Sequence, residues 1–318
     1  MDRARRTVRG NRRASPRIDS PGAGMAQTSS IVAPGVRRTA FVMAGGGSLG
    51  AVEVGMLQAL LDWGERPTFM VGASAGAINA AYFAGDPSLA GARRLEQLWC
   101  ALKRRDVFSI TLRSVLGLLR RRDHLVDSDG LRRLLERCLM YRRLEDAQVP
   151  VHIVASDLLT GNEVLLSTGA VVDAVLASTA IPGVFPPVRI NDRLLIDGGV
   201  ANNAPISAAV GLGATRVIVL PTGFACALEH PPSGFIARAM HALSLLVARQ
   251  LVHDAERFAG SAIELRIVPS LCPLSTSPYD YSAAATLIDR ARAGTQRWLE
   301  RGGLDRAGIP APLREHHD

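Results

Sequence analysis

The chain has 318 residues, of which 47% are hydrophobic and 21% are charged, which is typical of a folded globular protein and excludes a disordered one. Its formal net charge is +8, but residues 1–38 hold nine arginines against two acidic residues, so the remaining 280 residues are nearly neutral. Because nucleic-acid recognition needs basic charge on the folded body, this distribution argues against a nucleic-acid partner.

The cysteines and the apolar runs argue against several other classes. Cys100, Cys138, Cys226 and Cys272 lie far apart, with no C-x-x-C pair and no histidine at ligand spacing. We therefore expect buried, reduced thiols, with no disulfide framework, no metal site and no cofactor. We find neither a run of about 18 apolar residues nor an apolar segment behind the Arg-rich N-terminus, so we expect cytoplasmic residence.

Three segments with different compositions divide the chain. Residues 1–38 are rich in Arg, Ser, Pro and Gly and are predicted to form a disordered basic tail. Residues 39–301 alternate apolar runs with helical patterns and are predicted to form one folded domain, and residues 302–318 form a C-terminal tail.

A strand, a glycine-rich loop and a helix open this domain. Residues 39–44 form a continuous apolar run, residues 51–63 follow a helical pattern, and residues 68–71 form a second strand. The loop between them contains Gly45, Gly46, Gly47, Ser48, Leu49 and Gly50, which match the dinucleotide pattern G-x-G-x-x-G. That site also needs an acidic residue after the second strand, which this chain lacks. Consecutive backbone N–H groups forming an oxyanion hole are the preferred interpretation, with a plain tight turn as the alternative.

The second strand runs into the sequence Gly72-Ala73-Ser74-Ala75-Gly76, a G-x-S-x-G nucleophile elbow between a strand and a helix at residues 75–82. Such an elbow holds its serine in a strained turn, exposes the hydroxyl above the sheet at the positive end of the helix, and needs glycines two residues away on either side. The alternative is a small-residue helix start in which Ser74 acts as an N-cap.

Residues 92–145 change character, because large apolar side chains alternate with arginines, and a helix is predicted over residues 129–141. Two interpretations remain open. The segment is a cap-like insertion that touches lipid, or a helical pair packed on the sheet with solvated arginines.

Asp197 is the second residue with predicted chemistry. It follows a hairpin of residues 188–190 and 193–196 and precedes Gly198 and Gly199. At the C-terminal end of a strand it would lie at the edge of the sheet where sites form, and its carboxylate could act as a base for a serine hydroxyl. The alternative is that Asp-Gly-Gly only marks a turn.

The other predicted elements complete an α/β pattern. Strands are predicted at residues 150–156, 163–166, 215–221 and 262–268. Helices are predicted at residues 170–180, 205–212, 235–258 and 282–301.

Taken together, the glycine-rich loop at 45–50, the elbow at 72–76 and the Asp-Gly-Gly at 197–199 resemble the patatin-like phospholipase family. The stretches 177–187 and 202–205 support this resemblance, which is strong over 39–210 and vaguer to residue 301. The resemblance implies a three-layer α/β/α fold with a mostly parallel central sheet, as in acyl-protein hydrolases.

The same resemblance implies a serine hydrolase that cleaves acyl esters of phospholipids or related lipids through an acyl-serine intermediate. Ser74 would be the nucleophile and Asp197 its general base. The backbone N–H groups of Gly45, Gly46, Gly47 and Ser48, with help from Ala75, would form the oxyanion hole. The lipid substrate implies transient contact with a membrane surface.

One position departs from the family pattern, because Leu49 stands where the family usually carries Arg or Lys. The sequence leaves two other functions open. A Ser–His–Asp esterase or acyltransferase would need a histidine after the acid, for which His230, His241 and His253 are the candidates. A catalytically silent lipid- or membrane-binding module is the third hypothesis.

Overall fold

The structure of the protein is a computed structural model that describes residues 37–108, 126–223, 235–258, 260–306 and 308–310. Every element discussed below lies in Arg37–Asp318, the second of the two units into which the chain divides. The predicted basic tail therefore lies outside the described residues except for its last two, as do residues 109–125 of the predicted insertion and most of the C-terminal tail.

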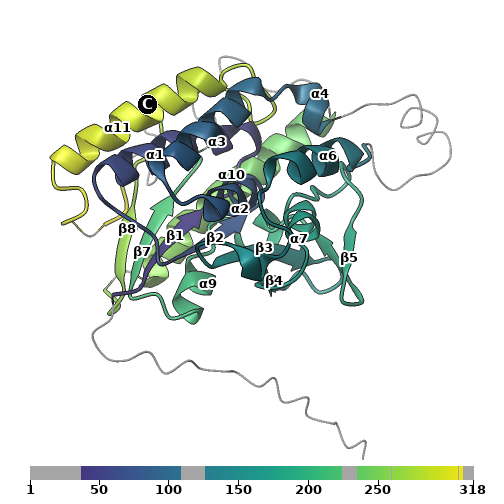
Figure 1. Cartoon of the computed structure of the whole chain (residues 1–318), viewed down its shortest axis with the longest axis horizontal. Helices are drawn as coiled ribbons and strands as arrows, with labels where there is room; N and C mark the ends of the chain where they lie inside the picture. The colour runs from purple at the N-terminus through teal and green to yellow at the C-terminus, as the bar shows by residue number, and fades with distance from the viewer. Residues whose placement is uncertain (1–36, 109–125, 224–234, 259, 307, 311–318) are drawn as a thin grey trace, which may run out of the picture. The chain divides into compact units, whose positions relative to one another are not determined.

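A mixed sheet of eight described strands forms the centre of the second unit, with the hydrogen-bonded order β5-β6-β3-β2-β1-β7-β8 and β4 paired to β3 (Figure 1). The strands β3, β2, β1, β7 and β8 are mutually parallel, and β4, β5 and β6 are attached by antiparallel pairing. The strands are β1 Thr39–Met43, β2 Phe69–Ala73, β3 Val151–Asp157, β4 Glu163–Leu166, β5 Val188–Ile190, β6 Arg193–Ile196, β7 Arg216–Leu220 and β8 Glu264–Ile267.

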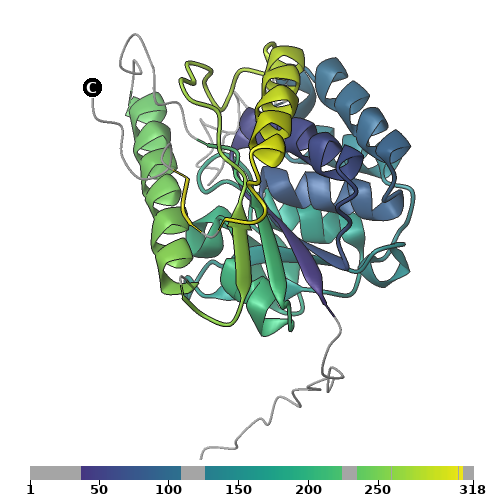
Figure 2. The ribbon, with the colours of Figure 1, turned by 90° about the vertical axis from the view of Figure 1, so that its left-hand side faces the viewer.

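Helices cover both faces of this sheet. The described helices are α1 Gly50–Asp62, α2 Ala75–Gly85, α3 Leu89–Ala101, α4 Arg104–Val107, α6 Asp129–Cys138, α7 Val171–Ser178, α8 Gly199–Asn202, α9 Ile206–Gly211, α10 Phe235–Phe258 and α11 Ala284–Glu300, with 3-10 turns at Gly47–Leu49 and Leu144–Asp146. Figure 2 shows α10 on one side of the strands, with α1, α3 and α11 on the other. The predicted three-layer α/β/α fold with a mostly parallel sheet is confirmed.

The central strand β1 explains why two apolar layers form. All five of its residues are buried, and its side chains alternate between the two faces. Phe41 and Met43 join the core under α1, α2, α3, α7 and α11, whereas Ala40 and Val42 join the core under α9 and α10. A continuous apolar strand is thus what a parallel strand covered on both faces requires.

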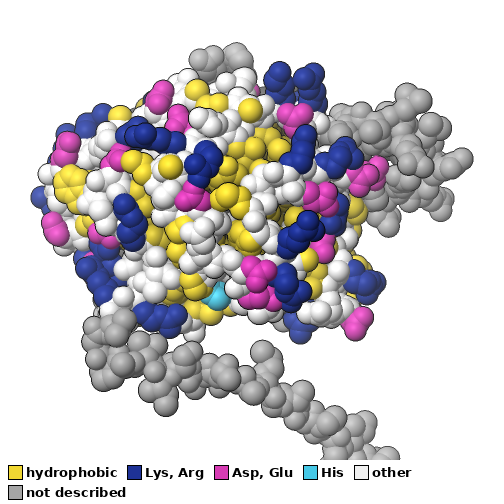
Figure 3. Space-filling view, in the orientation of Figure 1, with side chains coloured by type: hydrophobic (Ala, Val, Ile, Leu, Met, Phe, Trp, Pro, Cys, Tyr) yellow, Lys and Arg dark blue, Asp and Glu magenta, His cyan; other side chains and the backbone are white. Residues whose placement is uncertain are grey.

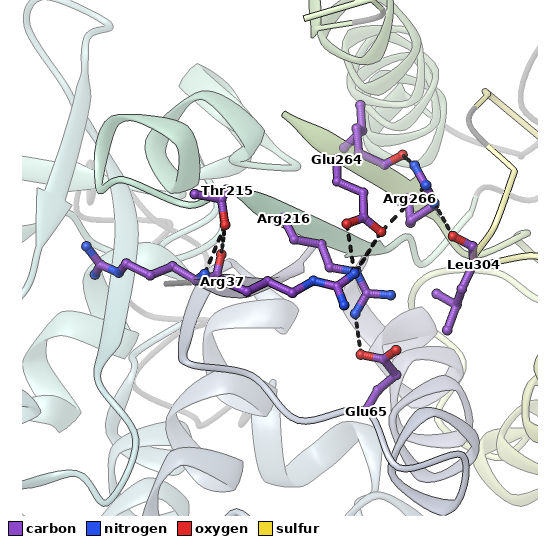
Figure 4. Close-up of polar contacts among 9 residues, drawn as sticks. Arg37, Glu65, Thr215, Arg216, Glu264, Arg266 and Leu304 are labelled. Carbon is purple, nitrogen blue, oxygen red and sulfur yellow. Dashed lines mark hydrogen bonds and ion pairs between the residues drawn. The ribbon is translucent and has the colours of Figure 1, made fainter. Parts of the chain in front are cut away.

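A buried arginine forms a network of ion pairs at the end of the sheet where the parallel strands begin (Figure 4). The Arg216 side chain is 4% exposed and donates to the carboxylates of Glu65 and Glu264. Arg37 also donates to Glu264, at 2.8 Å, and Arg266 donates to the carbonyl of Leu304. This network joins the start of β7 and β8 to the loop after α1 and to the segment after α11.

Candidate active site

The register of the sheet brings Ser74 and Asp197 together. Along one edge of β3, residues 153–156 pair with β4. Ser156 pairs with both Glu163 of β4 and Ile196 of β6, so β6 must lie along the other edge, the edge that β2 occupies beside residues 151–154. Strands β2 and β6 run in opposite directions along this shared edge, and their C-terminal ends therefore meet.

This arrangement corrects the reason given for the position of Asp197. The sequence predicts a strand that ends where the parallel strands have their C-terminal ends, but β6 runs antiparallel to β3. Continuing each register by one residue places Ser74 and Asp197 level with the same residue, Ala155. The Ser74 Oγ donates to Asp197 Oδ2 at 2.7 Å, although 123 positions separate the two residues.

Ser74 has the strained backbone of an elbow. Its φ of 52° and ψ of −121° are unusual for a residue with a side chain, and they turn the chain from β2 directly into α2. The flanking glycines are needed because of crowding: a Cβ on Gly72 would overlap the carbonyl of Gly76, and a Cβ on Gly76 would overlap the carbonyl of Met43. The N-cap alternative is not supported, because the Ser74 side chain makes no capping hydrogen bond to α2.

Asp197 is a buried carboxylate whose two oxygens are both hydrogen-bonded. Its Oδ2 accepts from Ser74, and its Oδ1 accepts from the Gly199 N–H at 2.7 Å. Burial raises the pKa of Asp197 from 3.8 to about 6, and these two hydrogen bonds oppose the rise. The carboxylate is therefore a stronger base than an ordinary aspartate and is still largely ionised near neutral pH.

Two serines hold this pair in place. Ser178 Oγ accepts from the Ser74 N–H at 2.8 Å and donates to the carbonyl of Val154 at 2.5 Å. Ser156 Oγ donates to the backbone carbonyl of Asp197 at 2.7 Å. The sequence predicts no role for either serine: Ser178 lies in the stretch 177–187 that supports the family resemblance, and Ser156 stands in a strand with no motif around it.

The glycine-rich loop lies directly against the elbow. A Cβ on Gly45 would come within 3.0 Å of the Ser74 Cβ, and a Cβ on Gly46 would overlap the side chain of Thr222. The Gly45 carbonyl accepts from Asn203 Nδ2 at 3.2 Å and from Thr222 Oγ1 at 2.7 Å. The loop is therefore fixed by segments that lie more than 150 positions further along the chain.

Two of the N–H groups predicted for the oxyanion hole already donate to backbone carbonyls. The Gly45 N–H donates to the carbonyl of Asn203 at 3.0 Å, and the Ser48 N–H donates to the carbonyl of Pro278 at 2.8 Å. These contacts exclude Gly45 and Ser48 as donors in this conformation, which corrects the prediction for both. Within the described part of the chain, the N–H groups of Gly46, Gly47 and Ala75 have no acceptor.

A second buried carboxylate lies beneath the loop, in α1. Glu53 is fully buried, with Oε1 accepting from the Ala44 N–H at 2.6 Å and Oε2 accepting from Asn79 Nδ2 at 2.7 Å. Burial raises the pKa of Glu53, and the same two hydrogen bonds oppose the rise. Leu49, which replaces the usual basic residue of the resembling family, is 1% exposed and packs in the apolar core beside this helix.

An apolar pocket opens beside Ser74 and Gly47, and much of its wall comes from the predicted insertion. The described part of the insertion packs as helices, and its contact with lipid stays a prediction. Helix α3 packs against α1, α2 and α11 in the helical layer, while α4 and α6 contact each other. The wall side chains are mostly aromatic and aliphatic, and they include Leu98, Trp99, Leu102, Phe108, Leu131, Leu135, Phe185, Tyr279 and Tyr281. Figure 3 shows hydrophobic side chains gathered on this face between α3 and α6, with basic side chains nearby.

The histidines do not complete a triad among the described side chains. His253 is exposed on α10, and both oxygens of Asp197 have other partners. His230 lies outside the described residues, and the side chain of His241 is not described.

The cysteine prediction is partly wrong. Cys100 and Cys272 are exposed and Cys138 is half-buried, while Cys226 lies outside the described residues. In α3 the helical period turns Trp99 inward and its neighbour Cys100 outward. The described residues contain no group of three or more His, Cys, Asp or Glu able to hold a metal ion. None of the described helices is long and apolar enough to cross a membrane.

The chain is similar to known proteins over most of its length. A protein-family model described as patatin-like phospholipase matches residues 41–210. An uncharacterized NTE family protein of Mycobacterium tuberculosis (strain ATCC 25618 / H37Rv) is 32% identical over 302 residues, covering 88% of this chain and 72% of that protein. The rat patatin-like phospholipase domain-containing protein 7 is 29% identical over 58% of this chain, which corresponds to 13% of its own length. Among solved structures, human GIVD cytosolic phospholipase A2 matches 85% of this chain and 60% of its own, with 14% identity and a TM-score of 0.43.

Proposed function

The chain belongs to the patatin-like phospholipase family, whose members are lipid acyl hydrolases, and on that basis we propose that Ser74 and Asp197 form a catalytic dyad that cleaves acyl esters of phospholipids or related lipids. The 2.7 Å hydrogen bond from Ser74 Oγ to the buried carboxylate of Asp197 is the observation that carries this proposal. A serine hydroxyl is a weak nucleophile until a base takes its proton, and in this proposal Asp197 is that base.

In the first half of the reaction, Ser74 Oγ attacks the ester carbonyl carbon while its proton moves to Asp197 Oδ2. The negative charge that develops on the carbonyl oxygen would be stabilised by the N–H groups of Gly46, Gly47 and Ala75. The C–O bond to the alcohol then breaks, the alcohol takes the proton from Asp197, and the acyl group remains on Ser74.

In the second half, water replaces the alcohol. Asp197 takes a proton from the water as the water oxygen attacks the acyl carbon, and the same backbone donors stabilise the second oxyanion. The bond to Ser74 Oγ breaks, the proton returns to this oxygen, and a fatty acid leaves. With a pKa of about 6, Asp197 is close to the strength at which one carboxyl serves as both base and acid near neutral pH.

The apolar pocket beside Ser74 is an argument for a substrate whose scissile ester carries an acyl chain. Its wall joins Ser74 and Gly47 to the aromatic side chains Phe108, Phe185 and Tyr279. Burial of each methylene of a chain in such a pocket is favourable by about 0.8 kcal/mol. The pocket therefore favours an apolar group.

We further propose transient contact between the membrane surface and α4 and α6, which form part of the pocket wall. Arg104 and Arg105 of α4 and Arg133 and Arg137 of α6 are exposed beside these apolar side chains. Basic residues near anionic lipid contribute about 1 kcal/mol each. Co-sedimentation with phosphatidylserine vesicles should exceed that with phosphatidylcholine vesicles and should weaken with salt; equal binding to both would contradict this contact.

A fluorophosphonate probe, which phosphonylates an activated serine, tests the dyad. Wild-type protein should be labelled, and both Ser74→Ala and Asp197→Asn should lose labelling. Ser74→Ala should also lose ester hydrolysis by a factor on the order of 10³ or more. The exposed His253→Ala serves as the matched control and should label like wild type.

Two outcomes would contradict the proposal. Ester hydrolysis retained by folded Ser74→Ala would exclude Ser74 as the nucleophile. Labelling lost in His253→Ala would favour a triad over the dyad.

A further inference from the structure

A chain of buried hydrogen bonds connects α1, α2 and α3 directly below the glycine-rich loop. Trp99 Nε1 donates to Asn79 Oδ1 at 2.7 Å, and Asn79 Nδ2 donates to Glu53 Oε2 at 2.7 Å. All three side chains are at most 2% exposed. The proposed chemistry on Ser74 uses none of them.

The orientation of Asn79 in this chain is fixed. Its amide nitrogen also donates to the carbonyl of Gly50 at 2.9 Å, and its oxygen accepts from the Trp99 N–H. Turning the amide over would place oxygen against the Gly50 carbonyl and nitrogen against the Trp99 donor. Asn79 can therefore present only a donor to Glu53.

Position 53 is thus faced by two donors. Oε2 meets the Asn79 amide nitrogen, and Oε1 meets the backbone N–H of Ala44 at 2.6 Å. A carboxylate accepts at both ends, whereas a glutamine would place its own NH₂ against one of these donors whichever way it turned. The two donors therefore require an acceptor at each oxygen, which the ionised carboxylate provides, and they oppose the rise in the pKa of Glu53 that burial causes.

Ala44 makes this requirement relevant to catalysis. It is the last residue before Gly45, and its N–H otherwise reaches only the Leu220 carbonyl, at 3.3 Å. At the other end of the chain, Trp99 lines the pocket beside Ser74. One buried carboxylate therefore connects the start of the oxyanion loop, the nucleophile helix and the pocket wall.

We propose that Glu53 is a positioning residue, whose carboxylate holds Ala44 and Asn79 so that the glycine-rich loop and the elbow keep the geometry that stabilises the oxyanion. This role rests on the proposed function of Ser74 and Asp197. Glu53 acts through the backbone of the loop and touches no substrate. Its loss should therefore lower kcat more than it changes KM.

The first test compares Glu53→Gln with Leu60→Val, a buried substitution two turns along the same helix that controls for lost stability. Glu53→Gln should lower kcat on a p-nitrophenyl ester about 10- to 100-fold with KM within about threefold, because misplaced oxyanion donors act on the transition state. Leu60→Val should keep its kcat. Wild-type kcat in Glu53→Gln, or an equal loss in Leu60→Val, would overturn the proposal.

A double-mutant cycle with Asn79→Asp tests the matching of donors and acceptors. Asn79→Asp alone would set two buried carboxylates against each other and should be severely impaired. In Glu53→Gln with Asn79→Asp, the glutamine can donate to the new carboxylate and still accept from Ala44. The double variant should recover at least tenfold over Asn79→Asp, although an aspartate at position 79 still sets an oxygen against the Gly50 carbonyl. Additive losses, or a double variant that does not fold, would overturn the proposal.

Hydrogen exchange separates this inference from the proposed function. Exchange of the backbone amides of residues 44–50 should be faster in Glu53→Gln than in wild type and unchanged in Leu60→Val, whether or not the protein hydrolyses esters. If wild type neither labels nor hydrolyses esters, the proposed function fails. If exchange in residues 44–50 is unchanged in Glu53→Gln, the positioning role fails.

Discussion

Replacing Asp197 with asparagine removes the charge of a buried side chain while keeping its hydrogen bonds. The Asn oxygen can accept from the Gly199 N–H, and the Asn amide can donate to Ser74 Oγ, in place of the contacts at 2.7 Å. The variant should therefore fold, lose the base, and avoid the cost of burying an ionised carboxylate. We expect Asp197→Asn to be inactive and more stable than wild type at pH 8.

The size of the expected gain in stability follows from the pKa of Asp197. Burial raises the pKa of Asp197 from 3.8 to about 6, which corresponds to roughly 3 kcal/mol. The folded protein binds this proton more tightly than the unfolded chain. The contribution of Asp197 to stability therefore falls as pH rises from about 4 to about 6 and is constant above that window. Asparagine does not titrate, so the gap between variant and wild type should open across the same window.

Urea unfolding at pH 4.5, 5.5, 7 and 8 measures this gap. Asp197→Asn should gain up to about 3 kcal/mol at pH 7 and 8, or roughly 5 °C in Tm, and much less at pH 4.5. Asp192→Asn, an exposed substitution in the β5–β6 turn, is the matched control and should follow wild type. A variant less stable than wild type at pH 8, or a gap that does not change with pH, would refute the reasoning.

Four further predictions test other parts of the structure. If Asp197 is the base, kcat/KM should fall about tenfold per pH unit below about pH 6 and level off above it, and a pH-independent profile would exclude that role. Gly76→Ala should lose about 1–3 kcal/mol in urea unfolding, because its Cβ would overlap a backbone carbonyl of β1. Arg216→Met should lose about 3 kcal/mol in the same assay, because two carboxylates lose a buried partner, and unchanged stability would contradict the role of this network. Tyr279→Ala should raise the ratio of kcat/KM for long over short p-nitrophenyl esters by enlarging the pocket, and an unchanged ratio would place the acyl chain elsewhere.

The local elements were predictable because each depends on a short-range rule. The apolar run of β1 and the helical pattern over residues 235–258 depend only on neighbouring residues, and both elements form where predicted. The hairpin of β5 and β6 turns at Asn191 and Asp192, which adopt the positive φ that such a two-residue turn requires. Glycine spacing in the elbow likewise reports a local steric requirement that any chain with this turn must meet.

The predicted oxyanion donors show the limit of such rules. The sequence indicates consecutive N–H groups in the glycine-rich loop, but it does not indicate which of them are already hydrogen-bonded. The carbonyl of Pro278 accepts from the Ser48 N–H, and the carbonyl of Asn203 accepts from the Gly45 N–H. Both carbonyls belong to segments that only folding brings near the loop. Glu53 was not singled out for the same reason, because its partners lie on other elements.

The α/β class, the elbow serine and the candidate acid were predictable, since each follows from patterns within short segments. The contact between Ser74 and Asp197 depends on the folded chain, because β2 and an antiparallel β6 share one edge of β3 and end at the same level. Folding also determines which backbone donors remain available and that α3, α4 and α6 form part of the pocket wall. Contacts between segments more than a hundred residues apart depend on strand register and layer packing, which no local pattern encodes.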